Sequence, residues 1–498
     1  ILRLVYYDAK TKRVYSLNAP WKSYADETDP KTIPVDDMGP LPNAPKPTEG
    51  AEGRKTLVPG FMAGIEAMHT RLGRLPFSDL FQPAIWYAEH GVHLTPGLVG
   101  PFVMRRKYLS RTSAGMRFMA QAGGEFPTAG ENFVQTDLAN TLREVARDGA
   151  KYMYTGKWAS DYVDAVRAAG GKATLDDLAS YRPIWEEPLR SSFLGNTVFS
   201  AGKTSDGSRQ ILEALNVVEE LKLEKDRPYF EDPKAMKDLS QALQLVQVER
   251  FGAAYIQQLA RLNAGRLSPE ALITKEHGRV LASMIESAPE ASLEDSAPAG
   301  TPAPNHSDSI VAVDRWGNVA AVVHSINTLW WGTTGIVVGG IPIPDAAGFQ
   351  QSLLGSLKPG SLVPDAMAPV VVVRNRHPVF AAGTIGESLV PETVRVLMGA
   401  LGNHLDNAAL IAAPPLLANF SPWLKGETLA QRALVIPAGA YSQDLLGGLR
   451  AEGLRVEEQG RLEVSTIKGT AVFLKMGHGR HMATSAEAPG VWDFGAAY

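Results

Sequence analysis

A stretch rich in alanine, proline and acidic residues divides this sequence into two parts of different character. It runs from residue 286 to residue 306 and reads ESAPEASLEDSAPAGTPAPNH. This composition buries too little apolar surface to hold one conformation, so we expect an exposed linker. The chain is therefore expected to comprise a larger part, residues 1–306, and a smaller part, residues 307–498, which together build one folded unit.

The larger part is predicted to be mainly helical. It opens with two alternating runs, residues 2–8 and 13–17, which predict a β-hairpin around a short turn. After an aperiodic stretch that ends near residue 56, apolar residues recur every three or four positions, as in an amphipathic helix. This helical spacing covers the segments near 61–72, 78–91, 136–148, 157–170, 208–224 and 235–263.

The smaller part begins with short apolar runs that predict strands. Residues 309–313 and 319–323 flank the turn-forming run DRWGN and predict a second hairpin. Further strands are expected at 370–373 and 379–382, followed by a helix near 391–404. Runs this apolar are typical of a sheet covered on both faces. Together the two parts predict a large α/β (α+β) fold.

The composition argues against several classes of protein. With 49 basic and 53 acidic residues the formal net charge is -4, which does not favour a nucleic-acid partner. No run of about 18 apolar residues predicts a membrane span. The absence of cysteine excludes disulfides and thiolate sites, and pairs of histidines such as His90 and His93 lack further ligands nearby, so we predict no metal or other cofactor.

A hydroxyl residue stands where the linker meets the first strand of the smaller part, in the run NHSDS at residues 305–309. If the peptide bond between His306 and Ser307 is cut, Ser307 gains an α-amine with a pKa of about 8. That amine can accept the proton of the serine hydroxyl at neutral pH, directly or through water. The same run also fits an ordinary polar turn, so both interpretations stay open at this point.

Several separated motifs occur in a fixed order along the chain. The larger part contains VPG at 58–60, LPF at 75–77, PAI at 83–85 and AAGGKATLDDLASY at 168–181. The smaller part contains SDSIVAVD at 307–314 with GNV at 317–319, and GTIGES at 383–388. In this order they resemble the motifs of the γ-glutamyltransferase family of N-terminal nucleophile hydrolases, and the resemblance extends from residue 4 over nearly the whole chain.

This resemblance implies a four-layer αββα sandwich that is autocleaved between His306 and Ser307. Ser307 stands where the family keeps its nucleophilic threonine, and a serine is chemically competent there. Ser325 matches a threonine that hydrogen-bonds the nucleophile, and Asn327 matches an asparagine that contacts substrate. Since Ser325 and Asn327 are two residues apart on a predicted strand, we expect them on one face.

The resemblance also places an oxyanion hole at residues 386 and 387. Gly386 matches the first of two glycines whose backbone N–H groups stabilise the tetrahedral intermediate. Glu387 replaces the second glycine. Its carboxylate would repel the intermediate unless the side chain turns away from the site.

The residues that recognise a γ-glutamyl group in the family are replaced in this sequence. Asp365 and Ala366 stand in place of two serines that bind the glutamyl carboxylate, and Gly348 in place of an aspartate that binds the α-amine. An acidic Asp365 would repel an acidic substrate group. Trp330 and Trp331 could line an apolar acyl pocket instead, although they could also simply fill the core. An acylase-like substrate is therefore expected rather than glutathione.

These implications form one hypothesis: a Ser307 acyl-enzyme that cleaves an amide bond of a small molecule and works as a heterodimer of its own two fragments. An uncleaved scaffold that binds a ligand, and a hydrolase of a carbon–carbon or oxalyl-type bond, remain open alternatives. The resemblance also implies a helix and a glycine-rich strand before residue 2, so we expect a trimmed or processed chain, or a sheet that has lost a strand. A periplasmic or secreted location is expected if the chain follows the family, and a cytoplasmic one if it is complete.

Overall fold

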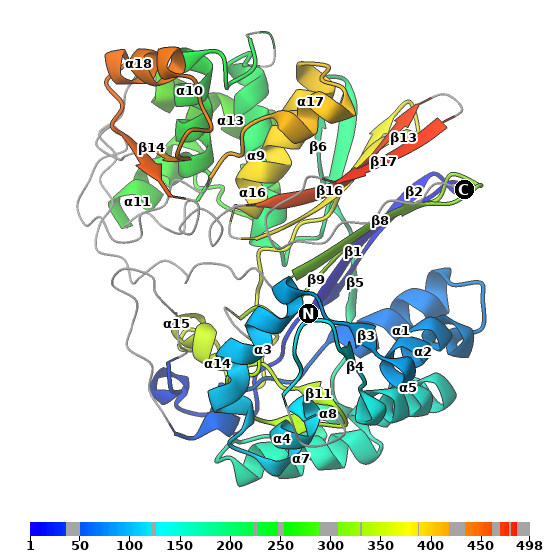
Figure 1. The fold of residues 1–498 in the computed structure, drawn as a ribbon. Helices are drawn as coiled ribbons and strands as arrows, with labels where there is room; N and C mark the ends of the chain where they lie inside the picture. The colour runs from blue at the N-terminus through cyan, green and yellow to red at the C-terminus, as the bar shows by residue number, and fades with distance from the viewer. Residues whose placement is uncertain are drawn as a thin grey trace. The chain divides into compact units, whose positions relative to one another are not determined.

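The computed structural model describes residues 1–35, 50–120, 126–223, 225, 227–247, 253–287, 307–328, 331–386, 388–417, 434–460, 469–477 and 480–485 (Figure 1). These residues belong to two compact units. The first unit combines residues 1–2, 19–184 and 325–363, and the second combines residues 3–18, 185–324 and 364–498. Each unit thus contains residues from both sides of the predicted linker.

Most of a five-stranded sheet lies in the second unit, with strand order β5-β2-β1-β9-β8. Both predicted hairpins belong to this sheet and are confirmed, and three of their four strands are two residues longer than predicted. The strands are β1 (Leu2–Asp8), β2 (Arg13–Ala19), β5 (Ile184–Glu186), β8 (Ser307–Val313) and β9 (Val319–Ser325).

A six-stranded sheet in the second unit has the order β17-β16-β13-β12-β7-β6, and each neighbouring pair is antiparallel. Its centre is the predicted strand pair at residues 370–373 and 379–382, in which Val370 lies opposite Ala382. The strands are β6 (Leu189–Phe193), β7 (Asn196–Ser200), β12 (Val370–Arg374), β13 (His377–Ile385), β16 (Thr470–Gly477) and β17 (Arg480–Ser485).

The two sheets pack against each other within the second unit. Because successive side chains of a strand point to opposite faces, alternate residues of each strand meet between the sheets. One buried cluster there is formed by Val5, Tyr7, Ala201, Val319, Ala321, Val371 and Ala381. The intervening residues Val370 and Val372 of β12 belong to a different core on the other face of the six-stranded sheet.

Helices cover that other face of the six-stranded sheet (Figure 1). The first begins at Ser205, whose hydroxyl caps the helix by accepting a hydrogen bond from Ser208 N at 3.1 Å. The buried residues of this layer come mainly from α9 (Asp206–Glu220), α10 (Pro233–Leu245), α13 (Lys275–Glu286) and α16 (Leu389–Leu397). The second unit therefore stacks a sheet, a second sheet and a helical layer.

The first unit has its own, largely helical core. Trp158, Tyr162 and Val166 follow one another at helical spacing on α7 and are buried there, with the Trp158 and Tyr162 rings stacked at 5.1 Å. The Tyr162 and Tyr24 hydroxyls hydrogen-bond each other at 2.6 Å, which satisfies two polar groups inside this core. The longer helices are α1 (Phe61–Leu72), α2 (Gln82–His90), α3 (Pro96–Leu109), α5 (Thr136–Asp148) and α7 (Lys157–Ala168).

The remaining elements are short. The first unit also contains η1 (Pro30–Thr32), η2 (Glu52–Lys55), η3 (Phe77–Phe81), β3 (Val92–His93), α4 (Ser113–Met119), β4 (Asn132–Phe133), α6 (Lys151–Tyr154), α8 (Leu175–Ala179), β10 (Val337–Val338), β11 (Ile341–Pro342), α14 (Ala346–Phe349) and α15 (Gln351–Leu354). The second adds α11 (Ala253–Leu262), α12 (Pro269–Leu272), η5 (Met398–Gly402), α17 (Asn407–Ala412), β14 (Leu434–Pro437), α18 (Gln443–Ala451) and β15 (Val456–Gln459). No helix within the described residues is long and apolar enough to cross a membrane.

Two sequence expectations need correction or restriction. The predicted helix over 235–263 is wrong as one element, because α10 ends at Leu245 and α11 begins at Ala253. The predicted linker starts too early, because residue 286 is still the last residue of α13. The rest of that linker, from residue 288 to His306, lies outside the described residues.

Candidate active site

Ser307 is the first residue of β8, the strand at one edge of the five-stranded sheet. Burial alternates along β8: Ser307, Ser309, Val311 and Val313 are half-buried, whereas the residues between them are exposed. Val311 and Val313 pack into the cluster between the sheets, so the half-buried row faces the six-stranded sheet. The proposed nucleophile therefore stands at the end of a row that faces the interior of the second unit.

Two polar side chains pair across the β8–β9 hairpin. His324 Nδ1 and Asp308 Oδ2 are 3.3 Å apart, with the aspartate as acceptor. The hydrogen bond from His324 lowers the pKa of Asp308. Burial lowers the pKa of His324, although the bond to Asp308 opposes that shift. This hydrogen bond joins the beginning of β8, next to Ser307, to the end of β9.

Acid is expected to destabilise the folded protein at His324, because burial disfavours its charged form. Because the pKa of His324 is lowered in the folded protein, the unfolded chain binds its proton more readily, and stability falls with pH below roughly 6.5. The Asp308 contribution is lost only at lower pH, below roughly 3.8. Urea midpoints measured from about pH 7.5 to about pH 5 should therefore depend less on pH in His324→Gln than in the wild type. If the urea midpoints of both proteins changed equally with pH, His324 would not be the cause of the pH dependence.

Ser325 and Asn327 lie in the first unit, where the expectation that they share one face of a strand is wrong. β9 ends at Ser325, and Asn327 has a left-handed backbone with φ of +50°. Asparagine tolerates this conformation better than most residues. The turn nevertheless brings the two residues together, because Asn327 N–H donates to Ser325 Oγ at 2.9 Å.

The turn after β13 contains a glycine in a backbone conformation that favours glycine. Gly386 is buried and has φ of +92°, a conformation that a side chain would strain. Its carbonyl accepts a hydrogen bond from Leu389 N at 3.3 Å, at the beginning of α16. Glu387 and Trp330 lie outside the described residues, as does His306.

β8 lies directly against β13 in the second unit. A Cβ atom placed on Gly383 would be 2.0 Å from Ser309 Oγ and 3.2 Å from Val323 Cγ2. A side chain at residue 383 would therefore require the Ser309 hydroxyl to move. The strand that begins with Ser307 and the strand that leads to the Gly386 turn therefore approach each other at this glycine.

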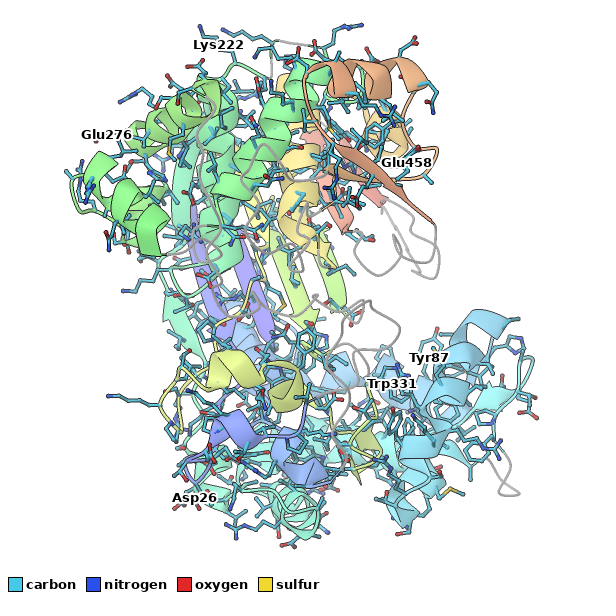
Figure 2. All side chains as sticks on the ribbon, turned by 90° about the vertical axis from the view of Figure 1, so that its left-hand side faces the viewer. Asp26, Tyr87, Lys222, Glu276, Trp331 and Glu458 are labelled. Carbon is cyan, nitrogen blue, oxygen red and sulfur yellow. The ribbon has the colours of Figure 1, made fainter. Side chains whose placement is uncertain are left out.

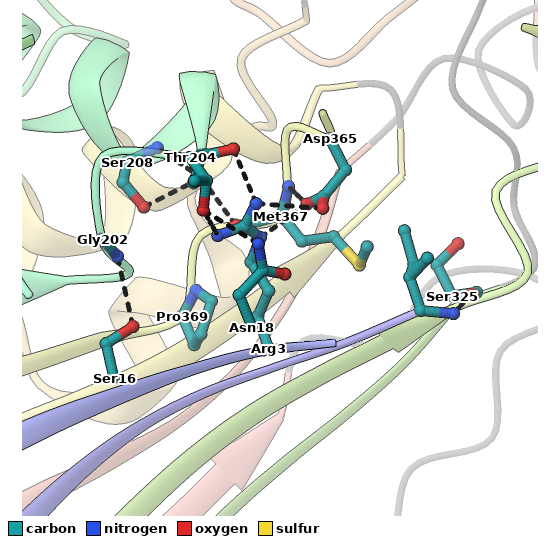
Figure 3. Close-up of polar contacts among 12 residues, drawn as sticks. Arg3, Ser16, Asn18, Gly202, Thr204, Ser208, Ser325, Asp365, Met367 and Pro369 are labelled. Atoms are coloured by element: carbon teal, nitrogen blue, oxygen red, sulfur yellow. Dashed lines mark hydrogen bonds and ion pairs between the residues drawn. The ribbon is translucent and has the colours of Figure 1, made fainter. Parts of the chain in front are cut away.

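Asp365 is engaged in a buried ion pair that the sequence did not reveal (Figure 3). Arg3 donates to it twice, from Nε to Oδ1 at 2.7 Å and from Nη2 to Oδ2 at 3.0 Å. Met367 N–H also donates to Oδ1, at 3.0 Å. The side chains of Arg3 and Asp365 are 0% and 2% exposed. Glu186 also pairs with Arg3, so one guanidinium contacts two carboxylates.

The other donors of Arg3 are also used within the second unit. Nη1 donates to Thr204 Oγ1 at 3.1 Å and to Glu186 Oε1 at 3.4 Å, and Nη2 donates to the Thr204 carbonyl at 2.7 Å. The Thr204 hydroxyl in turn bonds Glu186 and Asn18. With these bonds all five N–H groups of the guanidinium have acceptors in the protein. The exposed Ala366 follows Asp365 directly.

Trp331 belongs to an aromatic cluster of the first unit (Figure 2). Its ring meets those of Phe102 and Phe118 edge to face, at centroid distances of 5.5 and 6.3 Å. The same cluster contains the buried side chains of Leu109 and Met119. Such edge-to-face contacts are typical of core aromatic residues. Among the described residues, no group of three potential ligands could hold a metal ion.

The chain matches the family model of gamma-glutamyltranspeptidase over residues 3–480. The glutathione hydrolase proenzyme of Pseudomonas aeruginosa is 26% identical over 463 residues, which are 88% of this chain and 78% of that protein. The acylase ACY 1 proenzyme of Pseudomonas sp. strain V22 is 26% identical over 388 residues, which are 76% of this chain and 66% of that protein.

A solved structure shows the same fold. The cephalosporin acylase of Bacillus halodurans aligns with 99% of this chain and 87% of its own, with a TM-score of 0.73 and 19% identity. This likeness confirms the predicted α+β class and the N-terminal nucleophile hydrolase fold. The names of the sequence relatives are those of hydrolases and acylases, which confirms the expectation of an enzyme. The chain belongs to the γ-glutamyltranspeptidase family of N-terminal nucleophile hydrolases.

Proposed function

We propose that this protein cuts its own chain before Ser307 and then hydrolyses amide bonds of small acylated molecules with that serine. The observation that carries the proposal is the place of Ser307. It is the first residue of an edge strand of the five-stranded sheet, on the row of side chains that faces the six-stranded sheet, in a chain that matches the family over residues 3–480. Names of relatives that include the word proenzyme are consistent with cleavage.

The proposed reaction needs only groups of the protein and water. The α-amine of Ser307 takes the proton of the Ser307 hydroxyl as the oxygen attacks the substrate carbonyl carbon. Backbone N–H groups at the Gly386 turn stabilise the resulting oxyanion. The carbon–nitrogen bond then breaks, the protonated α-amine returns its proton to the leaving amine, and an ester on Ser307 remains. Water attacks this ester by the same route and releases the carboxylic acid.

A neutral acyl group is the proposed specificity. The family resemblance places Asp365 and Ala366 where a glutamyl carboxylate would bind. In this protein Arg3 already donates two hydrogen bonds to the carboxylate of Asp365. Because every N–H group of Arg3 has an acceptor within the protein, Arg3 has no donor left for a substrate carboxylate. The acylase among the relatives, rather than the glutathione hydrolase, is therefore the better guide to the substrate.

The test is incubation of the purified protein followed by intact mass measurement and a panel of anilides. We expect two fragments that meet between residues 306 and 307, and hydrolysis of aliphatic or aromatic acyl anilides at least about tenfold faster than of the γ-glutamyl anilide. A single stable chain would favour an uncleaved scaffold. A preference for the γ-glutamyl compound would contradict the proposed specificity but not the nucleophile.

A further inference from the structure

The half-buried row of β8 changes from apolar to polar side chains at Ser309. Val311 and Val313 of this row pack into the apolar cluster between the sheets, but Ser309 presents a hydroxyl on the same face. Ser309 Oγ is buried and has no hydrogen-bond partner among the residues that the structure describes. Buried hydroxyl groups nearly always have a partner in native proteins, so this one calls for an explanation.

The Ser309 hydroxyl lies against the backbone of Gly383. Ser309 Oγ lies so close to Gly383 that a Cβ atom there would be only 2.0 Å away. The glycine at residue 383 leaves the space that the hydroxyl occupies in this conformation. Since an alanine at residue 309 would avoid the cost of desolvating a hydroxyl, stability alone does not favour serine at this position.

The spacing of Ser309 from Ser307 suggests what it binds. Residues two apart on a strand point to the same face and are separated by about 6.7 Å. This distance is too long for a direct hydrogen bond between two hydroxyl groups, which needs about 2.8 Å. Two such bonds through one water molecule span about 5.6 Å, which small side-chain movements can match.

We propose that Ser309 is a positioning residue that holds a water molecule beside Ser307, an inference that rests on the proposed function. This water accepts the proton of the Ser307 hydroxyl while it passes one of its own protons to the Ser307 α-amine. The water is unchanged after the transfer, and Ser309 neither gains nor loses a proton. The step leaves an alkoxide-like oxygen that attacks the substrate carbonyl and an ammonium that later protonates the leaving amine.

The test compares Ser309→Ala with the wild type and with Val311→Ala, a control from the same face of β8. In Ser309→Ala we expect kcat for an acyl anilide to fall at least tenfold with little change in KM, and the melting temperature to stay equal or rise. The dependence of kcat on the deuterium fraction of the solvent should become linear, because only one proton then moves in the transition state. Val311→Ala should melt at a lower temperature and keep the kcat of the wild type.

Each result decides for or against the role of Ser309. A kcat of Ser309→Ala within twofold of the wild type would overturn it, as would a loss of activity that parallels a loss of melting temperature. An unchanged curved dependence on solvent deuterium would do the same. Failure of the proposed function is distinguishable, because the wild-type protein itself would then remain uncut or would hydrolyse no anilide.

Discussion

A Ser307→Ala variant is expected to remain a single chain of about 53.6 kDa after an incubation in which the wild-type protein separates into two fragments. Cleavage before residue 307 requires a nucleophile on the side chain of residue 307, and alanine has none. The variant should also lose hydrolysis of acyl anilides by at least about 10³-fold, as removal of a nucleophile does in other hydrolases. Intact mass and a denaturing gel measure the first effect, and release of the aniline measures the second.

A second serine-to-alanine variant serves as a control. It separates the loss of the nucleophile from a general effect of replacing a serine by alanine. Ser192 lies at an exposed position of β6 in the same unit, and Ser192→Ala should process at the rate of the wild type. Continued cleavage of Ser307→Ala between residues 306 and 307 would show that another residue is the nucleophile. A Ser307→Ala variant that melts at the wild-type temperature would exclude unfolding as the cause of its inactivity.

The second large effect is expected at the ion pair of Arg3 and Asp365. Replacing Arg3 by methionine keeps much of the side-chain volume but leaves Asp365 as a buried charge without its partner. Breaking a buried pair in this way costs about 3–5 kcal/mol of the free energy of unfolding. Glu186 would lose an N–H donor at the same time. Urea denaturation, followed by fluorescence, measures the loss.

A double variant tests whether this cost comes from the unpaired charge. Arg3→Met combined with Asp365→Leu removes both charges and should be more stable than Arg3→Met alone. The exposed pair of Lys157 and Asp161 on α7 provides the control, and Lys157→Ala should leave the urea midpoint nearly unchanged. If the losses at Arg3 and Asp365 simply add, the two residues are not energetically coupled and the ion pair does not hold this part of the fold.

Local patterns predicted many of the elements. The segments 61–72 and 136–148 are the observed α1 and α5, residue for residue. In α5 the apolar residues recur at helical spacing on one side of an otherwise polar segment, so one period fits it. The helix α13 was not predicted, although Thr274 caps its first turn, because it follows directly on short, irregular elements.

Helix and strand ends were less predictable where tertiary packing sets them. β8 and β9 extend two residues beyond the apolar runs that predicted them, because pairing in the sheet includes the polar residues at their ends. Asn327 was expected on a strand, but β9 ends at Ser325 and Asn327 itself has a left-handed backbone. Backbone pairing, rather than side-chain hydrophobicity, decides such boundaries.

The order of the motifs was sufficient to identify the family and the α+β class, because each motif is a run of neighbouring residues that resembles the family's own. Only the folded protein joins Arg3 to Asp365, which are 362 positions apart, or places Ser309 against Gly383. The physical reason is that charge balance and the burial of a hydroxyl depend on which strands become neighbours. No local pattern records that choice, so the substrate preference and the water-binding role proposed for this site depend on tertiary contacts.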